Sequence, residues 1–335
     1  MKLHFFTIRD IEDYRVHYEI FEPLKKAVEK LKPQTVEELD QVFFFDSVKE
    51  DFTMLGDVYE SEIFGETGIE GLRLDFNFGL RLDIPEGNFR VKISDFDTGK
   101  IVFDKYISGG RLLSAEQHFI RWHVEVFLDD EKVFEHTLNL EGQPVIIAFT
   151  ETTLGDGIAS WAFLYAFRDK YKCELSVFLQ ESFRRLFSYL YPDINLVDKI
   201  GFKTYATYYP FMFTGVLPLF PGDVRRISMT RMGGLFLGID YLPPKNIFKP
   251  TAPSVTEEPY VCIAVQARNA RKSWHYPNGW DIVINYLKNL GYRVFCIDKE
   301  KEMTNDGYTV RKPEGAEDFT GNIPLTERAN MLYHA

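Results

Sequence analysis

The stretch PVIIAFTETTLGDGIASW, residues 144–161, decides the fold. It opens with a continuous apolar run, which is typical of a strand buried on both faces of a parallel sheet. A Thr-rich turn with Gly155, Asp156 and Gly157 follows, and a helical apolar pattern covers residues 158–172. The order strand, turn, helix predicts the first βα unit of an α/β fold.

The same alternation continues toward the C-terminus, with a linker at residues 250–259. The expected strands are residues 173–180, 194–198, 260–267 and 292–298, and the expected helices are residues 181–191, 278–291 and 324–335. This pattern predicts two Rossmann-like domains, residues 144–254 and 255–335. The second has about 80 residues and two obvious strands, where ~100–150 residues are usual, so we expect it to be incomplete.

Toward the N-terminus the apolar pattern changes to a period of two. Residues 69–143 contain five alternating runs separated by Gly- and Asp-rich turns, which predicts antiparallel hairpins in a small barrel or sandwich of about five or six strands. Residues 1–68 begin with a strand-like run and continue with an amphipathic helical pattern. They carry no chemical motif, and we assign them to an extension of unknown role.

Composition excludes several classes of function. The 335 residues include 39 Lys and Arg against 50 Asp and Glu, with no dense basic cluster, so a nucleic-acid partner is not expected. Cys173, Cys262 and Cys296 lie far apart in apolar runs, which predicts buried reduced thiols and no metal site. No signal peptide and no apolar run of ~20 residues is present, so we expect a cytoplasmic protein without membrane contact. The 16% aromatic content suits a subunit interface, and thus a homo-oligomer.

Asp156 between two glycines has two physical interpretations. As a helix N-cap, its carboxylate would accept hydrogen bonds from free backbone N–H groups. As a general base, it would stay ionised at the helix N-terminus and accept a proton from a hydroxyl nucleophile, while the glycines let a substrate approach the backbone. A nicotinamide site is disfavoured because Ser160 replaces the third glycine of the fingerprint, and no Gly-Lys-Ser/Thr of a P-loop follows.

The loop after the strand at 260–267 carries Gln266, Arg268, Arg271 and Lys272. The three cations, Arg268, Arg271 and Lys272, could neutralise a diphosphate or could simply be solvated. Trp274 and Trp280, in the same segment, could pack in the core or form a stacking wall for a sugar or base. The helical position of Trp280 favours the core for that residue.

Several segments resemble a known family. TTLGDGIA at residues 152–159 and DFTGNIPLTERANML at 318–332 resemble motifs of ADP-heptose glycosyltransferases. Together with FNFGLRLDIPEGNFRVKISDFDTGKIVFD, YVCIAVQARNARKSW and YPNGWDIVINYLKNLGYRVFCIDKE, they resemble the autotransporter strand-loop-strand O-heptosyltransferases. The resemblance covers about residue 70 to the end of the chain.

The resemblance implies a GT-B architecture with a β-rich N-terminal domain and a sugar nucleotide bound between two Rossmann-like domains. Members of the family transfer heptose from ADP-heptose to serine hydroxyls of an autotransporter adhesin passenger in the cytoplasm, and they assemble into large rings. Carried over by position, Asp156 is the general base and Lys272 binds the donor phosphates. Thr153 and Gly155 line the sugar side, and Gln266 lies on the donor side.

Two alternatives stay open: a sugar-nucleotide transferase that acts on lipopolysaccharide core, and a degenerate, non-catalytic copy of the fold. The family continues beyond the position of Ala335 with a Gly-rich turn and a cysteine cluster that binds structural iron. We therefore expect no cofactor in this chain, and weakened or absent activity for these residues alone.

Overall fold

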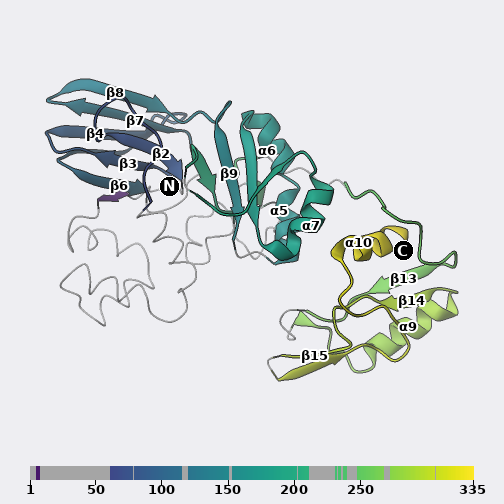
Figure 1. Cartoon of the computed structure of the whole chain (residues 1–335). Coiled ribbons are helices and arrows are strands. Elements are labelled where there is room, and N and C mark those ends of the chain that lie inside the picture. The colour runs from purple at the N-terminus through teal and green to yellow at the C-terminus, as the bar shows by residue number, and fades with distance from the viewer. Residues whose placement is uncertain are drawn as a thin grey trace. The chain divides into compact units, whose positions relative to one another are not determined.

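The chain divides into two units, which a computed structural model describes separately (Figure 1). One unit contains residues 1–183 and 193–245, and the other contains residues 184–192 and 246–335. The residues described are 5–7, 61–77, 79–114, 120–150, 153–201, 203–210, 231, 233–234, 237–239, 247–267, 272–305 and 307–335. Most of the predicted extension at 1–68 therefore lies outside the described residues.

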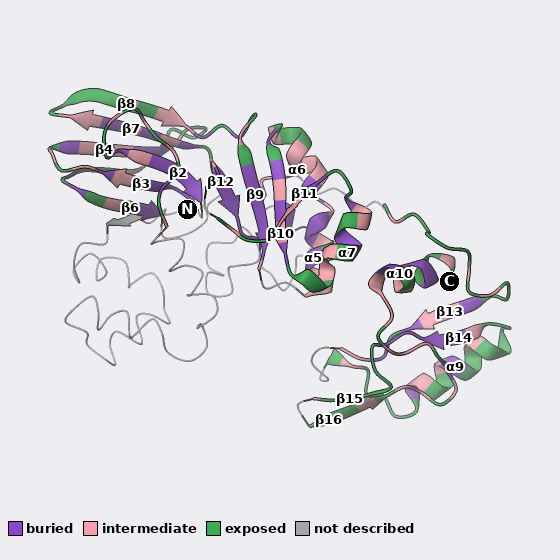
Figure 2. Cartoon of the chain, in the orientation of Figure 1, coloured by how far each residue is buried: buried purple, intermediate pink, exposed green. Residues whose placement is uncertain are grey.

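The first unit is built on an eight-stranded mixed sheet. Its strands, in spatial order, are β1 (Phe5–Thr7), β6 (Gly110–Ser114), β3 (Arg81–Ile84), β2 (Arg73–Asn77), β12 (Ala206–Tyr208), β9 (Pro144–Phe149), β10 (Glu174–Leu179) and β11 (Asn195–Val197). The half from β1 to β2 is antiparallel, and the half from β2 to β11 is parallel. All residues of β9 after Pro144 are buried (Figure 2), which confirms the interpretation of its continuous apolar run.

The two halves of this sheet join at β12. Ala206 pairs with Phe76 of β2 on one side and with Val145 of β9 on the other, both in parallel. The predicted boundary between residues 143 and 144 therefore separates segments that share one hydrogen-bonded sheet. The antiparallel strands support the parallel strands directly, through this shared layer.

A second sheet of the first unit is antiparallel, with the strand order β5-β4-β7-β8. Its strands are β4 (Phe89–Asp95), β5 (Ile101–Ile107), β7 (Trp122–Leu128) and β8 (Glu131–Thr137). Alternate residues of β4 and β7 are buried, as the period of two predicts. His136 of β8 stacks on Phe76 of β2 with 5.9 Å between ring centroids, so the two sheets face each other there. The hairpins thus form two open sheets, and their seven strands, β2 to β8, exceed the five or six expected.

Two helices accompany the parallel strands of the first unit: α5 (Leu154–Trp161) and α6 (Leu164–Tyr171). A third helix, α7 (Glu181–Leu190), follows β10, and its residues from Arg184 onward belong to the second unit. The single helix predicted at 158–172 is wrong in two respects. Helical structure begins at Leu154, before the apolar pattern does, and it is interrupted at residues 162–163. Trp161, at the end of α5, and Phe163, within the break, are both fully buried and anchor the two helices in the core.

The second unit contains a three-stranded parallel sheet, with the order β13 (Tyr260–Ile263), β14 (Arg293–Cys296) and β17 (Glu317–Asp318). It also contains α9 (Gly279–Asn289), α10 (Leu325–His334) and the hairpin of β15 (Glu302–Asn305) and β16 (Tyr308–Arg311). The expected strands and helices are confirmed, whereas β17 and the hairpin were not predicted. No helix in the described part of the chain is long and apolar enough to cross a membrane.

Candidate functional site

The motif around Asp156 forms the first turn of α5, directly after β9. Thr153 is the N-cap, with extended φ and ψ of −72° and 164°, and Asp156 occupies the third helical position. Asp156 Oδ2 accepts a hydrogen bond from Thr153 Oγ1 at 2.8 Å and a longer one from the Thr153 backbone N–H at 3.3 Å. The interpretation of Asp156 as the N-cap is therefore wrong, because Asp156 is the reciprocal partner of the cap residue.

The two carboxylate oxygens of Asp156 differ in their surroundings. Oδ2 is held by Thr153, whereas Oδ1 accepts no hydrogen bond from any residue that the structure describes. The side chain is half-buried and lies in the first turn of α5, where the helix dipole attracts negative charge. A carboxylate with one oxygen fixed and the other available can accept a proton from a correctly placed hydroxyl.

The two glycines that flank Asp156 lie in different surroundings. Gly155 is exposed, and a Cβ atom built there would meet no atom of the described residues within 4 Å. Gly157 is buried, and its Cβ would lie 3.0 Å from Cζ2 of Trp161. Gly155 thus leaves the backbone open to an approaching molecule, as the sequence suggested, whereas Gly157 makes room for the Trp161 ring one turn further along the same helix.

The carboxyl ends of the neighbouring parallel strands meet at the same edge of the sheet. Gln180, after β10, donates from Nε2 to the carbonyl oxygen of Thr150, after β9, at 3.2 Å. This bond ties the segment before α5 to the adjacent strand. The turn that carries Asp156 thus begins from a residue fixed by the sheet edge.

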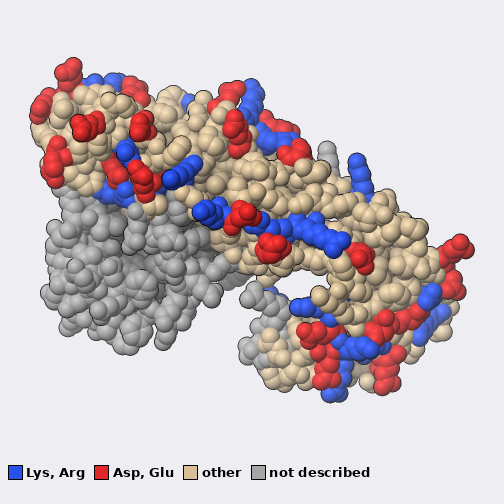
Figure 3. All heavy atoms as spheres, viewed as in Figure 1, with Lys and Arg blue, Asp and Glu red and all other residues tan. Residues whose placement is uncertain are grey.

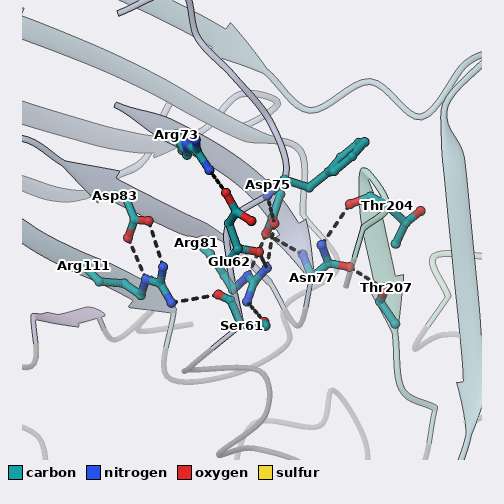
Figure 4. A network of polar contacts seen from close by, with 11 residues as sticks. Ser61, Glu62, Arg73, Asp75, Asn77, Arg81, Asp83, Arg111, Thr204 and Thr207 are labelled. Carbon is teal, nitrogen blue, oxygen red and sulfur yellow. Dashed lines mark hydrogen bonds and ion pairs between the residues drawn. The ribbon is translucent and has the colours of Figure 1, made fainter. Parts of the chain in front are cut away.

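A buried polar network lies in the antiparallel half of the sheet (Figure 4). Arg81 donates from Nε and Nη2 to both carboxylate oxygens of Asp75, at 2.7 and 2.6 Å. Asn77, at the end of β2, donates to the carbonyl oxygen of Thr204 at 2.9 Å and accepts from the Thr207 hydroxyl. The network joins β2, β3 and β12, so it supports the sheet that carries the candidate site.

Gln266 and Lys272, the predicted donor-side residues, follow β13 in the second unit. Gln266 donates from Nε2 to the carbonyl oxygen of Glu300 at 2.7 Å, which leaves its side-chain oxygen as the remaining polar atom. Lys272 is exposed, and no carboxylate among the described residues pairs with its Nζ. Arg268 and Arg271 lie outside the described residues. The described part of the loop therefore offers one cation for an anionic ligand.

Asp298 is a residue of this region that the sequence analysis missed. It follows β14, is 6% exposed, and accepts hydrogen bonds from the backbone N–H groups of Val265 at 2.8 Å and Gln266 at 3.1 Å. The signal was available, because an acidic residue directly after a buried strand is unusual unless it is bound by partners.

The two tryptophans of this segment have different environments. Trp280 packs on the core cluster around Ile284, which confirms the core interpretation for that residue. Trp274 is 48% exposed; its ring fills the space above Gly279 and meets Trp280 edge-on, with 5.3 Å between centroids. Trp274 is therefore not a core residue, and its role as a stacking wall for a sugar or base stays a prediction.

The predicted site residues thus form two groups. Thr153, Gly155 and Asp156 lie together at the start of α5 in the first unit, and Gln266 and Lys272 lie on one loop of the second. On the face seen in Figure 3, Lys and Arg alternate with Asp and Glu over the described surface. Recognition of an anion on this face would therefore depend on local groups.

Comparisons with known proteins agree on one family. Residues 68–130 match the model of the N-terminal domain of glycosyltransferase TibC. The chain is 38% identical over 271 residues to autotransporter heptosyltransferase Aah of Escherichia coli, covering 79% of the chain and 69% of that relative. It is 30% identical to the inactive autotransporter heptosyltransferase BimC of Burkholderia thailandensis, covering 80% of the chain and 65% of BimC.

Two solved structures are similar to the chain. One is the iron-containing dodecameric glycosyltransferase TibC of enterotoxigenic E. coli, with a TM-score of 0.76, 35% identity, and coverage of 82% of the chain and 74% of TibC. The other is dodecameric TibC in complex with ADP-D-β-D-heptose, with the same TM-score and identity and coverage of 82% and 73%.

Proposed function

The chain belongs to the autotransporter heptosyltransferases, a family of glycosyltransferases, and we propose that it moves heptose from ADP-heptose to serine hydroxyls of an autotransporter passenger. The catalytic part of this proposal rests on the difference between the two carboxylate oxygens of Asp156. One oxygen is fixed by Thr153 and the other is available, and the neighbouring Gly155 leaves the backbone open.

In the proposed reaction, the serine oxygen attacks the anomeric carbon of the heptose. The new glycosidic bond forms as the bond from that carbon to the ADP β-phosphate oxygen breaks, and ADP leaves with the electron pair. Asp156 Oδ1 takes the serine proton, while Thr153 keeps the carboxylate oriented. General base catalysis of this kind contributes about 10²–10⁴-fold to the rate.

For the donor, we propose the loop that follows β13. Lys272 would meet the diphosphate, and its charge would stabilise the leaving ADP. The side-chain oxygen of Gln266 would accept from a donor hydroxyl or amino group. In this proposal the two units correspond to the two Rossmann-like domains of a GT-B enzyme. The similarity to TibC in complex with ADP-D-β-D-heptose supports this choice of donor.

TibC is described as dodecameric, and we propose that this chain also forms a homo-oligomer. TibC is also described as iron-containing, but the cysteines described here do not fit such a site. Burial raises the pKa of each thiol, Cys173, Cys262 and Cys296, to about 11, which disfavours the thiolate that binds metal. No group of three or more metal-binding side chains occurs among the described residues, and no step of the proposed reaction uses iron.

Intact-mass spectrometry of a serine-rich passenger fragment, incubated with ADP-heptose and the chain, tests this function. The wild type and the exposed control Asp169→Asn should add heptose-sized masses, and Asp156→Asn should not. Asparagine preserves the shape of the side chain but cannot accept the proton. Retained turnover in Asp156→Asn would leave Asp156 as a helix-capping partner only.

The same experiment separates the alternatives. Transfer to lipopolysaccharide core, with none to the passenger fragment, would identify a lipid-linked acceptor. A folded wild type that binds ADP-heptose without transfer to either acceptor would place the chain with the non-catalytic copies, as the similarity to inactive BimC allows.

A further inference from the structure

We propose that Asp298 is a positioning residue: its buried carboxylate fixes the start of the loop that follows β13, which is the proposed donor-binding loop. The proposal rests on the proposed function, in which the loop after β13 meets the donor diphosphate. Asp298 itself would not touch the donor. It would act through the backbone of Val265 and Gln266.

The two oxygens of Asp298 bind two successive amides of the loop. Oδ2 accepts from Val265 N–H at 2.8 Å, and Oδ1 accepts from Gln266 N–H at 3.1 Å. With 6% of Asp298 exposed, these bonds are shielded from water, and hydrogen bonds to a shielded charge are stronger than those between neutral groups. The bidentate contact fixes the direction in which the chain leaves β13.

The position of Asp298 explains why a side chain is needed there. The ladder between β13 and β14 pairs Ile263 with Cys296, and it ends with a bond from Ile297 N–H to the Ile263 carbonyl oxygen at 2.9 Å. Beyond this point the strands offer no further backbone acceptor to the amides of Val265 and Gln266. The carboxylate therefore extends the pairing past the end of the sheet.

A second bond ties the same loop to the segment after β14. Gln266 Nε2 donates to the carbonyl oxygen of Glu300 at 2.7 Å. Residues 265–266 are thus held by a side chain and by a backbone group, both from residues 298–300. In the proposal, this anchor also restricts the position of Lys272, which follows further along the chain.

In dinucleotide-binding folds, an acidic residue near the end of the second strand binds a ribose hydroxyl. Asp298 occupies a comparable place, after β14, but its two oxygens are already engaged by buried amides. Cys296 Sγ adds a third contact at 3.3 Å to Oδ2. The carboxylate therefore binds the loop, and it does not take the place of a ligand for a sugar hydroxyl.

The test measures ADP affinity by calorimetry and hydrogen exchange of the peptide that covers residues 260–267. The variants are Asp298→Asn, which can accept from only one of the two N–H groups and presents an amide donor to the other, and Asp298→Ser, which keeps a small acceptor and removes the charge. The control Glu317→Gln removes a carboxylate that pairs with Arg293 on the adjacent strand. We expect both Asp298 variants to weaken ADP binding by about tenfold and to speed exchange, and the control to do neither.

Unchanged exchange in a folded Asp298→Ser variant would overturn the proposal. Faster exchange with unchanged ADP affinity would also overturn it, because the loop would then be anchored without serving the donor. If the wild type itself fails to bind ADP while exchange responds as expected, the donor assignment of the proposed function fails, and the role of Asp298 is reduced to fold stability. Melting curves of all four proteins distinguish these results from unfolding.

Discussion

Arg81 and Asp75 form a two-bond ion pair in which both side chains are 1% exposed. The pair lies between β2 and β3, and Asp75 also accepts from the backbone N–H groups of Phe64 and Asn77. Arg81 also donates to the hydroxyl of Ser61 at 2.6 Å. Each charge is therefore satisfied only as long as the other is present.

We expect Asp75→Asn to lower the free energy of unfolding by about 3–5 kcal/mol, because it leaves a buried guanidinium without its counter-charge. Urea denaturation followed by tryptophan fluorescence measures this loss. The control Arg90→Gln breaks the more exposed pair with Asp104 and should have a much smaller effect. Equal losses in the two variants would contradict the expectation.

The glycines beside Asp156 should respond in opposite ways to alanine. Gly155→Ala should raise the free energy of unfolding by about 0.5–1 kcal/mol, because alanine favours the helix and its methyl group meets no atom. Gly157→Ala should lower it by about 1–3 kcal/mol, since the methyl group crowds the Trp161 ring.

Transfer activity separates these two positions further. If substrate approaches the backbone at Gly155, Gly155→Ala should reduce the rate of heptose transfer although the protein is more stable. Thermal melts and mass-spectrometric rates on the same samples measure both properties. A more stable Gly155→Ala variant with full activity would exclude close approach at this position.

Local sequence patterns predicted the strands in which burial is either continuous or alternates from one residue to the next. The apolar run of β9 and the alternation in β4 and β7 are of this kind. The position of β12 between β2 and β9 was not predictable, because it depends on pairing between segments far apart in the chain. The two-residue strand β17 was missed for the same reason.

The functional roles of Thr153 and Asp156 stay predictions, and the sequence indicated their local geometry only in part. Thr153 and Asp156 have the spacing of a capping box, but Gly155 and Gly157 lower helix propensity and delayed the predicted start of α5. The position of Asp298 after a buried strand was a signal that its carboxylate is bound, but a single sequence does not reveal which backbone amides bind it.

The contact between Thr153 and Asp156 predicts a kinetic signature. Thr153→Val should lower kcat by about tenfold because the carboxylate loses its hydroxyl partner, and it should lower the free energy of unfolding by about 1 kcal/mol as a cap is lost. The KM for ADP-heptose should stay unchanged, since the donor loop is untouched. Thr153→Ser, which retains the hydroxyl, should restore both quantities. A raised KM with normal kcat would instead indicate that Thr153 contacts the sugar.

His136 predicts a pH dependence of stability. Its ring stacks between Phe76 and Phe134, and its Nε2 lies 2.8 Å from the Tyr205 hydroxyl. That hydroxyl oxygen already accepts from Asn139 N–H, so its proton is available to a neutral imidazole. Burial, and to a lesser extent the nearby His123, lowers the pKa of His136 below its ordinary value.

The sign of the effect follows from proton binding. Below about pH 6.5 the unfolded chain protonates His136 while the folded chain does not, so the free energy of unfolding should fall as the pH decreases toward the lowered pKa. Urea denaturation at about pH 7.5 and about pH 5.5 measures this loss. His136→Gln retains a hydrogen-bonding group near Tyr205 but does not titrate, and it should lose less stability over the same interval than the wild type. Identical losses would show that other groups, such as the surface carboxylates, cause the dependence.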